Sequence, residues 1–137
     1  MRLVFGHDDD VADFVSQSLG IVIYPPFTAI GFAKASGLVG GAVFNGFNGS
    51  NIEVTMYAPR GMLRGVLRAL AHYTFVQLRC NRVTARTKRS NKPVQRMLTR
   101  GGFAFEGVMK RYFGPDRMDD AMLYRLDKET ALQRWIA

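Results

Sequence analysis

Residues 28–58 contain three short runs of β-branched, aromatic and small apolar residues, at 29–34, 38–44 and 52–57. Ser36-Gly37 separates the first two runs, and a glycine- and asparagine-rich segment, 45–51, separates the second from the third. Short turns of these residues join neighbouring antiparallel strands. The segment therefore predicts a three-stranded antiparallel meander, and any fold of this chain must be built around that sheet.

Apolar periodicity and turn residues place the other elements. A strand and a helix are expected before the meander, and a long helix, a strand, a short helix and two strands after it. Their expected ranges are 2–5, 11–19, 62–78, 82–87, 91–100, 103–113 and 118–126. The order β-α-βββ-α-β-α-ββ contains no repeat and predicts an α+β fold with a mixed sheet. A length of 137 residues fits one domain.

An acidic run, His7-Asp8-Asp9-Asp10, stands before the first helix. Asp8 or Asp9 is expected to accept hydrogen bonds from the free amides of the first helical turn, and the other carboxylates suit the positive end of the helix. A site for a substrate amine or a metal ion is the alternative interpretation of this run. No other cluster has the ligand spacing of a metal site, so no metal is expected.

The formal charge of +8 is distributed unevenly. No acidic residue occurs between Glu53 and Glu106, whereas eleven lysines and arginines fall in that stretch. Such a field attracts anions, so a phosphate-bearing partner is one interpretation and a generally basic surface is the other. Charge alone does not separate the two.

The chain has no apolar run long enough to cross a bilayer, and its first ten residues turn acidic where a signal peptide would be apolar. Its one cysteine, Cys80, cannot form an internal disulfide, which fits a reducing compartment. A cytoplasmic protein without membrane contact is expected. Cys80 follows an apolar helix and is expected to pack in the core rather than act as a nucleophile.

The region 73–113 carries a family resemblance in the sequence YTFVQLRCNRVTARTKRSNKPVQRMLTRGGFAFEGVMKRYF. Helix, strand, asparagine turn, short helix, Gly-Phe and Glu-Gly follow one another here as they do in the GNAT superfamily of acetyl-coenzyme A-dependent N-acetyltransferases. The chain resembles RimJ/RimL-like and compact phage-type members over nearly its whole length. The resemblance implies one GNAT-like acetyltransferase domain over residues 1–137. Its mixed, mostly antiparallel sheet would have a splayed parallel strand pair ending near Tyr57 and Thr87, flanked by three main helices.

The resemblance also implies which residues bind acetyl-coenzyme A. In the family the pantetheine arm lies between the splayed strands, and amides at the start of the next helix hold the pyrophosphate. The matching residues in this chain are Met56, Tyr57, Ala58, Arg60, Arg64, Gly65 and Asn91. Asn91 also stands where it can cap the short helix, and the two uses are compatible.

The pyrophosphate loop departs from the family pattern Q/R-x-x-G-x-G/A. Residues 62–67 keep only its middle glycine, Gly65, and place Leu67 where the family has a small residue. A side chain there could weaken or shift cofactor binding. Arg60 and Arg64 could compensate by direct contact with phosphate, or they could form a solvated helix edge together with Arg68.

For catalysis the resemblance points to Glu53 as a base acting through water, with backbone amides of 56–58 polarising the acetyl carbonyl. Glu53 could instead be a strand residue that faces solvent or pairs with an arginine. Some relatives have a tyrosine seven residues after the asparagine, but this chain has Leu98 there. Tyr57 is the expected substitute for the missing acid, and Tyr112 and Ser90 are the alternatives.

The expected function is therefore transfer of an acetyl group to an amine, on a protein N-terminus, a lysine or a small molecule. The alternative is a catalytically degenerate GNAT-fold module that binds nucleic acid or an acidic protein through its basic face. A homodimer is compatible with the edge strands near the C-terminus and with Trp135 in the terminal segment.

Overall fold

A computed structural model of the protein describes residues 1–59 and 61–136. The strands are β1 (Arg2–Val4), β2 (Thr28–Lys34), β3 (Gly37–Asn45), β4 (Asn51–Tyr57), β5 (Arg82–Lys88), β6 (Ala104–Met109) and β7 (Ala121–Asp127). The helices are α1 (Asp8–Leu19), α2 (Leu63–Ala71) with a π-helical extension (His72–Gln77), α3 (Lys92–Arg100), a 3-10 turn (Arg117–Asp119) and α4 (Lys128–Ala131) with a π-helical end (Leu132–Ile136). The predicted order of elements is confirmed.

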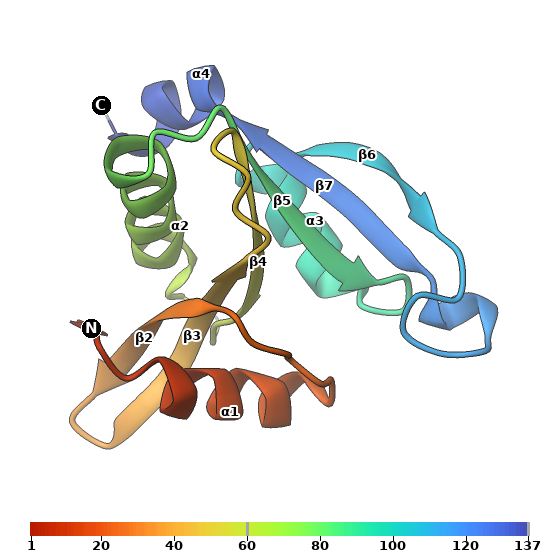
Figure 1. Ribbon diagram of the computed structural model, residues 1–137, viewed down its shortest axis with the longest axis horizontal. Helices are drawn as coiled ribbons and strands as arrows, with labels where there is room; N and C mark the ends of the chain where they lie inside the picture. The colour runs from red at the N-terminus through yellow and green to blue at the C-terminus, as the bar shows by residue number, and fades with distance from the viewer. Residues whose placement is uncertain (60, 137) are drawn as a thin grey trace.

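The seven strands form one sheet in the order β1-β2-β3-β4-β5-β7-β6. All neighbours are antiparallel except β4 and β5, which run parallel. The parallel pair follows from the sequence, because α2 lies between the two strands and carries the chain back to the starting edge. The predicted α+β fold with a mixed, mostly antiparallel sheet is confirmed (Figure 1).

The two parallel strands separate before they end. Their pairing runs from Asn51 opposite Arg82 to Val54 opposite Ala85 and stops there. Beyond that point β4 stays paired with β3, and β5 stays paired with β7, up to the ends of both strands. The inner edges of β4 and β5 are therefore left without a partner strand, and Figure 1 shows the two arrows diverging. The predicted splay is present.

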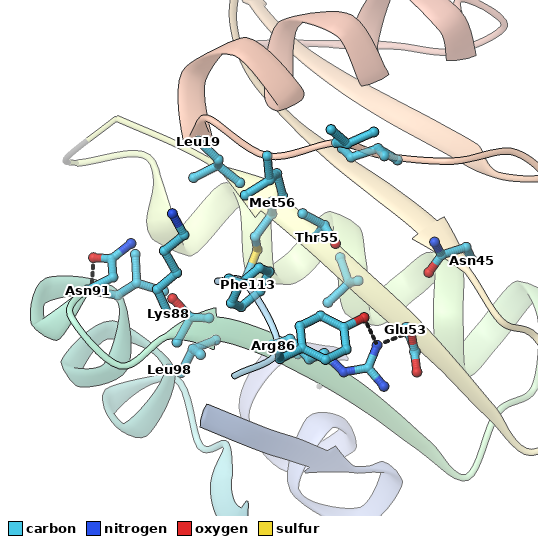
Figure 2. A pocket seen from close by; sticks show the side chains of 18 of the residues that line it. Leu19, Asn45, Glu53, Thr55, Met56, Arg86, Lys88, Asn91, Leu98 and Phe113 are labelled. Carbon is cyan, nitrogen blue, oxygen red and sulfur yellow. Dashed lines mark hydrogen bonds and ion pairs between the residues drawn. The ribbon is translucent and has the colours of Figure 1, made fainter. Parts of the chain in front are cut away.

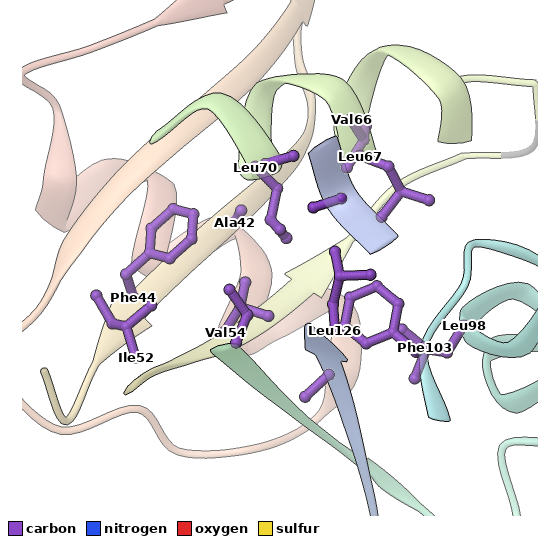
Figure 3. Close-up of a cluster of buried hydrophobic side chains, with 14 of the residues drawn as sticks. Ala42, Phe44, Ile52, Val54, Val66, Leu67, Leu70, Leu98, Phe103 and Leu126 are labelled. Atoms are coloured by element: carbon purple, nitrogen blue, oxygen red, sulfur yellow. The ribbon is translucent and has the colours of Figure 1, made fainter. Parts of the chain in front are cut away.

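The main core lies between the sheet and the helices α2, α3 and α4 (Figure 3). Val66, Leu67 and Leu70 recur at helical spacing and are buried, whereas Arg64 and Arg68 on the other side of α2 are exposed. Because the helix is amphipathic, its apolar side packs against Phe44 and its neighbours on the sheet. The interpretation of these arginines as a solvated edge holds for Arg64 and Arg68.

A smaller core lies under α1, on the opposite face of the sheet. Val11 and Val15 of the helix pack against Val43 of β3. The helix can approach so closely because Gly41 has no side chain: a Cβ added there would lie 2.6 Å from Cγ1 of Val11. Gly41 is thus required by packing between α1 and β3 rather than by backbone conformation.

The predicted cap of α1 is wrong. His7 occupies the N-cap position and makes no side-chain capping bond, while Asp8, Asp9 and Asp10 lie in the first turn. The Oδ1 atom of Asp8 instead accepts a hydrogen bond of 3.1 Å from the backbone N–H of Ala29. The carboxylates still favour the positive helix end, but Asp8 also fastens α1 to β2.

The paired glycines after α3 serve two different purposes. Gly102 has a φ of +96°, which favours glycine and ends the helix as predicted. Gly101 has an ordinary helical conformation, but a Cβ there would lie 2.7 Å from Cδ1 of Leu67. Gly101 therefore lets α2 and α3 pack closely. Phe103, which follows them, is buried as predicted.

The C-terminal segment closes against α3. The indole N–H of Trp135 donates a hydrogen bond of 2.8 Å to the carbonyl oxygen of Gly101. Trp135 is thus engaged within the chain, and the homodimer stays a prediction. Cys80 is buried, as expected of a core residue. None of the helices in the described residues has the length and apolar character required to cross a membrane.

Candidate functional site

A cleft of about 230 Å³ opens where β4 and β5 diverge (Figure 2). The two strands form its floor, α3 forms one wall, and the segment 21–24 after α1 and the connection between β6 and β7 form the others. Among the lining residues are Glu53, Thr55, Met56, Arg86, Lys88, Asn91, Val94, Leu98, Tyr112 and Phe113. The cleft therefore combines segments from both halves of the sequence.

The floor of the cleft presents unpaired peptide groups. Residues 55–57 of β4 and 86–88 of β5 belong to the strands, yet the two strands do not pair with each other over these ranges. Peptide N–H and C=O groups need hydrogen-bond partners when water is removed from them. An extended ligand that carries its own amide groups could supply those partners by lying between the strands as an additional strand would.

An ion pair joins the strands just where they separate. The Nη1 atom of Arg86 on β5 lies 2.6 Å from Oε2 of Glu53 on β4. The same nitrogen lies 3.3 Å from the hydroxyl of Tyr112, whose ring centroid is 4.9 Å from the guanidinium carbon. The Nε atom of Arg86 is buried and has no hydrogen-bond partner among the described residues. Arg86, which lines the cleft, thus retains one unused donor beneath the surface of the cleft.

The wall that carries Tyr112 and Phe113 is held by Asp120. This carboxylate, only 3% exposed, accepts hydrogen bonds from the backbone N–H of Arg111, at 2.9 Å, and from Nη1 of Arg89, at 3.1 Å. The Arg111 hydrogen bond first, and the Arg89 guanidinium in addition, hold the pKa of Asp120 below its usual value. The turn before α3 and the β6–β7 connection are therefore fastened to one group.

Asn91 takes part in both the helix and the cleft. Its side-chain oxygen accepts a hydrogen bond of 3.4 Å from the backbone N–H of Val94, so Asn91 is the N-cap of α3. The same residue lines the cleft. The predicted capping role is confirmed, and the remaining side-chain amide is placed where it can contact a ligand.

Structural comparison gives the fold, whereas comparison of sequences gives no relative. Neither a family model nor a curated protein matches the sequence. A solved mutant of spermidine N-acetyltransferase SpeG from Vibrio cholerae superposes with a TM-score of 0.81 at 14% identity, covering 98% of this chain and 99% of that chain. This chain has the GNAT fold.

Two further solved forms of the same Vibrio cholerae enzyme are similar to this chain. The dodecameric structure has a TM-score of 0.78 at 14% identity and covers 97% of this chain and 96% of that chain. The structure in complex with CoA and spermine has a TM-score of 0.76 at 13% identity and covers 96% of this chain and 97% of that chain. The GNAT fold is thus shared along the whole length of both proteins.

Three of the residues expected at a GNAT site line the cleft, namely Glu53, Met56 and Asn91. The side chain of Tyr57 lies elsewhere, because its ring packs against Phe14 of α1 with a centroid distance of 6.2 Å. Ala58 packs against the main core. The backbone groups of Tyr57 and Ala58 remain predicted contacts of the cofactor. The role of the Tyr57 side chain as proton donor to the thiolate also stays a prediction.

The pyrophosphate-loop residues lie at the start of α2. Met62 is the N-cap and provides no side-chain capping bond, and Arg64 is exposed in the first turn. Gly65 faces away from the cleft, because a Cβ added there would lie 2.6 Å from the Met1 side chain. Arg60 lies outside the described residues, so its predicted phosphate contact has no structural description.

Leu67 is not among the described residues that line the cleft. Its side chain is fully buried and points at Gly101. The larger residue in the GNAT loop is therefore accommodated between two helices, and it leaves the space between β4 and β5 open.

Several residues of the cleft could not be found from the sequence. The apolar segment 21–24 and Phe113 reach the cleft only through tertiary packing, and no local pattern marks them. Arg86 was partly anticipated, because one interpretation of Glu53 was that it pairs with an arginine. In residues 1–59 and 61–136 no group of three His, Cys, Asp or Glu side chains is placed to hold a metal ion.

Proposed function

We propose that this protein is an acetyl-coenzyme A-dependent N-acetyltransferase that transfers an acetyl group to an amine. The observation that carries the proposal is the open cleft between β4 and β5, where both strands have unpaired inner edges. The same fold supports acetyl transfer in the spermidine N-acetyltransferases, one of which was solved with CoA and spermine.

The cleft suits the cosubstrate along its length. The pantetheine arm carries two amide groups that can pair with 55–57 of β4 and 86–88 of β5. Val94 and Leu98 of α3 offer an apolar wall beside it. Asn91 adds a side-chain amide at the end of β5.

The start of α2 suits the pyrophosphate. The first amides of a helix have no intrahelical acceptor, and together with the helix dipole they favour an anion. Here Met62 provides no competing side-chain cap, and Arg64 adds a positive charge in the first turn. Because Leu67 is turned toward Gly101, it leaves this approach free.

Acetyl transfer forms a C–N bond between the amine and the acetyl carbon and breaks the C–S bond of the thioester. The attacking amine must lose a proton, and Glu53 is the carboxylate in the cleft that can accept it through a water molecule. The departing thiolate must gain a proton. The Tyr112 hydroxyl lines the cleft and is placed to accept a hydrogen bond from Arg86, which leaves its own proton free to be donated.

Calorimetric titration with acetyl-coenzyme A and with coenzyme A tests the proposal. Saturating cosubstrate is expected to stabilise the fold by about 3 kcal/mol at a hundred times the dissociation constant. Thiol release is then measured with a panel of amines. No heat, and no shift of the thermal midpoint at millimolar cosubstrate, would overturn the proposal. Arg125→Gln also removes one positive charge but is expected to leave binding of acetyl-coenzyme A unchanged, since Arg125 pairs with Glu106 and Asp127 away from the cleft.

The second candidate is a non-enzymatic module that binds nucleic acid or an acidic protein. It is favoured by one specific feature: Lys92, Arg96 and Arg100 follow one edge of α3 and line a shallow groove there. Binding through phosphate contacts falls steeply as salt is raised. A gel-shift series with duplex and single-stranded nucleic acid across salt concentrations separates this candidate from an acetyltransferase, for which little binding is expected at physiological ionic strength.

A further inference from the structure

The cleft is poor in negative charge. Among its described lining residues there is one carboxylate, Glu53, and there are two cations, Arg86 and Lys88. The carboxylate is already engaged, since Oε2 of Glu53 lies 2.6 Å from Nη1 of Arg86. A polycationic acceptor such as a polyamine would find no free carboxylate in this cleft, and the net positive charge of the chain would repel it.

The other acids on the elements around the cleft do not line it. Asp8, Asp9 and Asp10 lie in the first turn of α1 and Asp13 follows one turn later, whereas the cleft touches Leu19 at the opposite end of this 12-residue helix. At a rise of about 1.5 Å per residue, Leu19 lies about 16 Å from Asp8 and about 9 Å from Asp13 along the helix. In the connection between β6 and β7, Asp119 accepts a hydrogen bond from the N–H of Asp116, and Asp120 is paired with Arg89.

Arg86 has an unused donor at this site. Its Nη1 atom contacts Glu53 and Tyr112, but its Nε is buried and has no partner among the described residues. The Tyr112 ring lies over the guanidinium, at 4.9 Å. Tyr112 stays in place through its contact with Arg86 and its packing against Phe113, at a centroid distance of 4.9 Å, and the Arg86 side chain beneath it is still 24% exposed. A carboxylate is the group that a guanidinium edge binds best.

We propose that the acceptor is a primary amine that also carries a carboxylate, and that Arg86 binds this carboxylate while the amine is acetylated. The inference rests on the acetyl transfer proposed above and names its substrate class. Arg86 and Glu53 are in direct contact, and the attacking amine must come within reach of Glu53 through one water molecule. An amine in that position and a carboxylate beside Arg86 would be separated by roughly the length of a lysine side chain. A free amino acid and an acidic peptide both meet this description.

Two small amines test the proposal directly. L-lysine and 1,5-diaminopentane differ only by the carboxylate, and L-lysinamide retains the backbone but has a neutral amide in its place. Acetylation by the wild-type chain is expected to give a kcat/KM for lysine about tenfold or more above those of the diamine and the amide. Peptides that begin Ser-Asp or Ser-Lys separate the two sources: a preference for Ser-Asp over both Ser-Lys and lysine identifies an acidic peptide, and a preference for lysine identifies a free amino acid.

Variants assign the preference to Arg86. Arg86→Gln is expected to abolish the difference between lysine and diaminopentane, and Arg125→Gln, on the same face but outside the cleft, to preserve it. Equal use of the diamine, spermidine and lysine by the wild type would overturn the proposal, as would a preference that survives Arg86→Gln. If Arg86→Gln does not fold, the comparison of lysine with lysinamide on the wild type still tests whether the carboxylate is recognised, and equal use of the two would overturn the proposal. If the protein does not bind the cosubstrate at all, it is the acetyl transfer proposed above that is overturned.

Discussion

Leu67 of α2 packs against the backbone of Gly101 at the end of α3, where an added Cβ would lie 2.7 Å from the Cδ1 atom of Leu67. The contact explains how the chain accommodates a large residue in the segment that resembles a pyrophosphate loop. The side chain fills a space that a glycine on another helix has left free. The cleft between β4 and β5 consequently stays open.

Gly101→Ala is expected to destabilise the protein by about 1–3 kcal/mol, because the new methyl group overpacks the contact with Leu67. Urea denaturation measures the change. Adding Leu67→Val should restore part of the loss, so that the double variant is more stable than the sum of the two single changes predicts. Gly107→Ala is the control, since no atom lies within 4 Å of its added Cβ. Additive effects of the two changes would contradict the packing argument.

Glu53→Gln is expected to lower kcat by about 10²- to 10⁴-fold, because the amide cannot accept the proton of the attacking amine. The amide keeps the size of the side chain and can still accept a hydrogen bond from Arg86. Glu106→Gln controls for the loss of a surface ion pair, because Glu106 pairs with Arg82 and Arg125 outside the cleft. An unchanged kcat for Glu53→Gln would exclude the base role.

Asp120→Asn is expected to lower the urea midpoint at neutral pH and to lose this effect in acid. The pKa of Asp120 is held low by the Arg111 amide and the Arg89 guanidinium, so the ionised form is favoured in the folded state. Its stabilising contribution is therefore present above the ordinary pKa of about 3.9 and disappears as the pH falls through the lower folded value. Urea titrations of both proteins from about pH 7 down to about pH 3 measure the difference. A difference that persists undiminished in acid would contradict the assignment.

Much of the fold could be predicted because its elements are determined by local pattern. The strands of the meander, the apolar stripe of α2 and the proline after Asn91 each act within one element. The errors occurred where tertiary contacts compete with local ones. Asp8 bonds to Ala29 of β2 instead of capping α1, and the strand expected over 103–113 is only Ala104–Met109, with a register shift between Phe105 and Gly107.

The candidate site was only partly predictable, since its parts meet through the sheet. Glu53 and Asn91 were found by their positions in a resemblance, and both line the cleft. The contact of Arg86 with Tyr112 joins β5 to a connection 26 residues further along the chain. No sequence spacing predicts that contact, because it depends on how closely the β6–β7 connection packs against β5 in the folded chain.

Cys80 is expected to be unreactive in the native protein. The thiol is buried, and burial raises its pKa, so both access and the thiolate fraction are reduced. Native protein treated with a thiol reagent should label slowly, and protein in denaturing urea should label at once with one equivalent per chain. The result matters for activity measurements, since thiol release can then be followed without a background. Rapid labelling of the native protein would place Cys80 at an accessible site.

Replacement of Asn91 can separate its two uses. Asn91→Asp should preserve the cap of α3, because Asp and Asn are about equally effective N-caps, and Asn91→Ala should cost about 1 kcal/mol in urea denaturation. The aspartate removes the amide donor and adds a negative charge beside the cleft, so affinity for acetyl-coenzyme A should fall about tenfold or more in calorimetry. The aspartate variant thus keeps stability and loses affinity, while the alanine variant loses both. If the aspartate variant binds as tightly as the wild type, Asn91 is a helix cap alone and the cosubstrate makes its contacts elsewhere along β5.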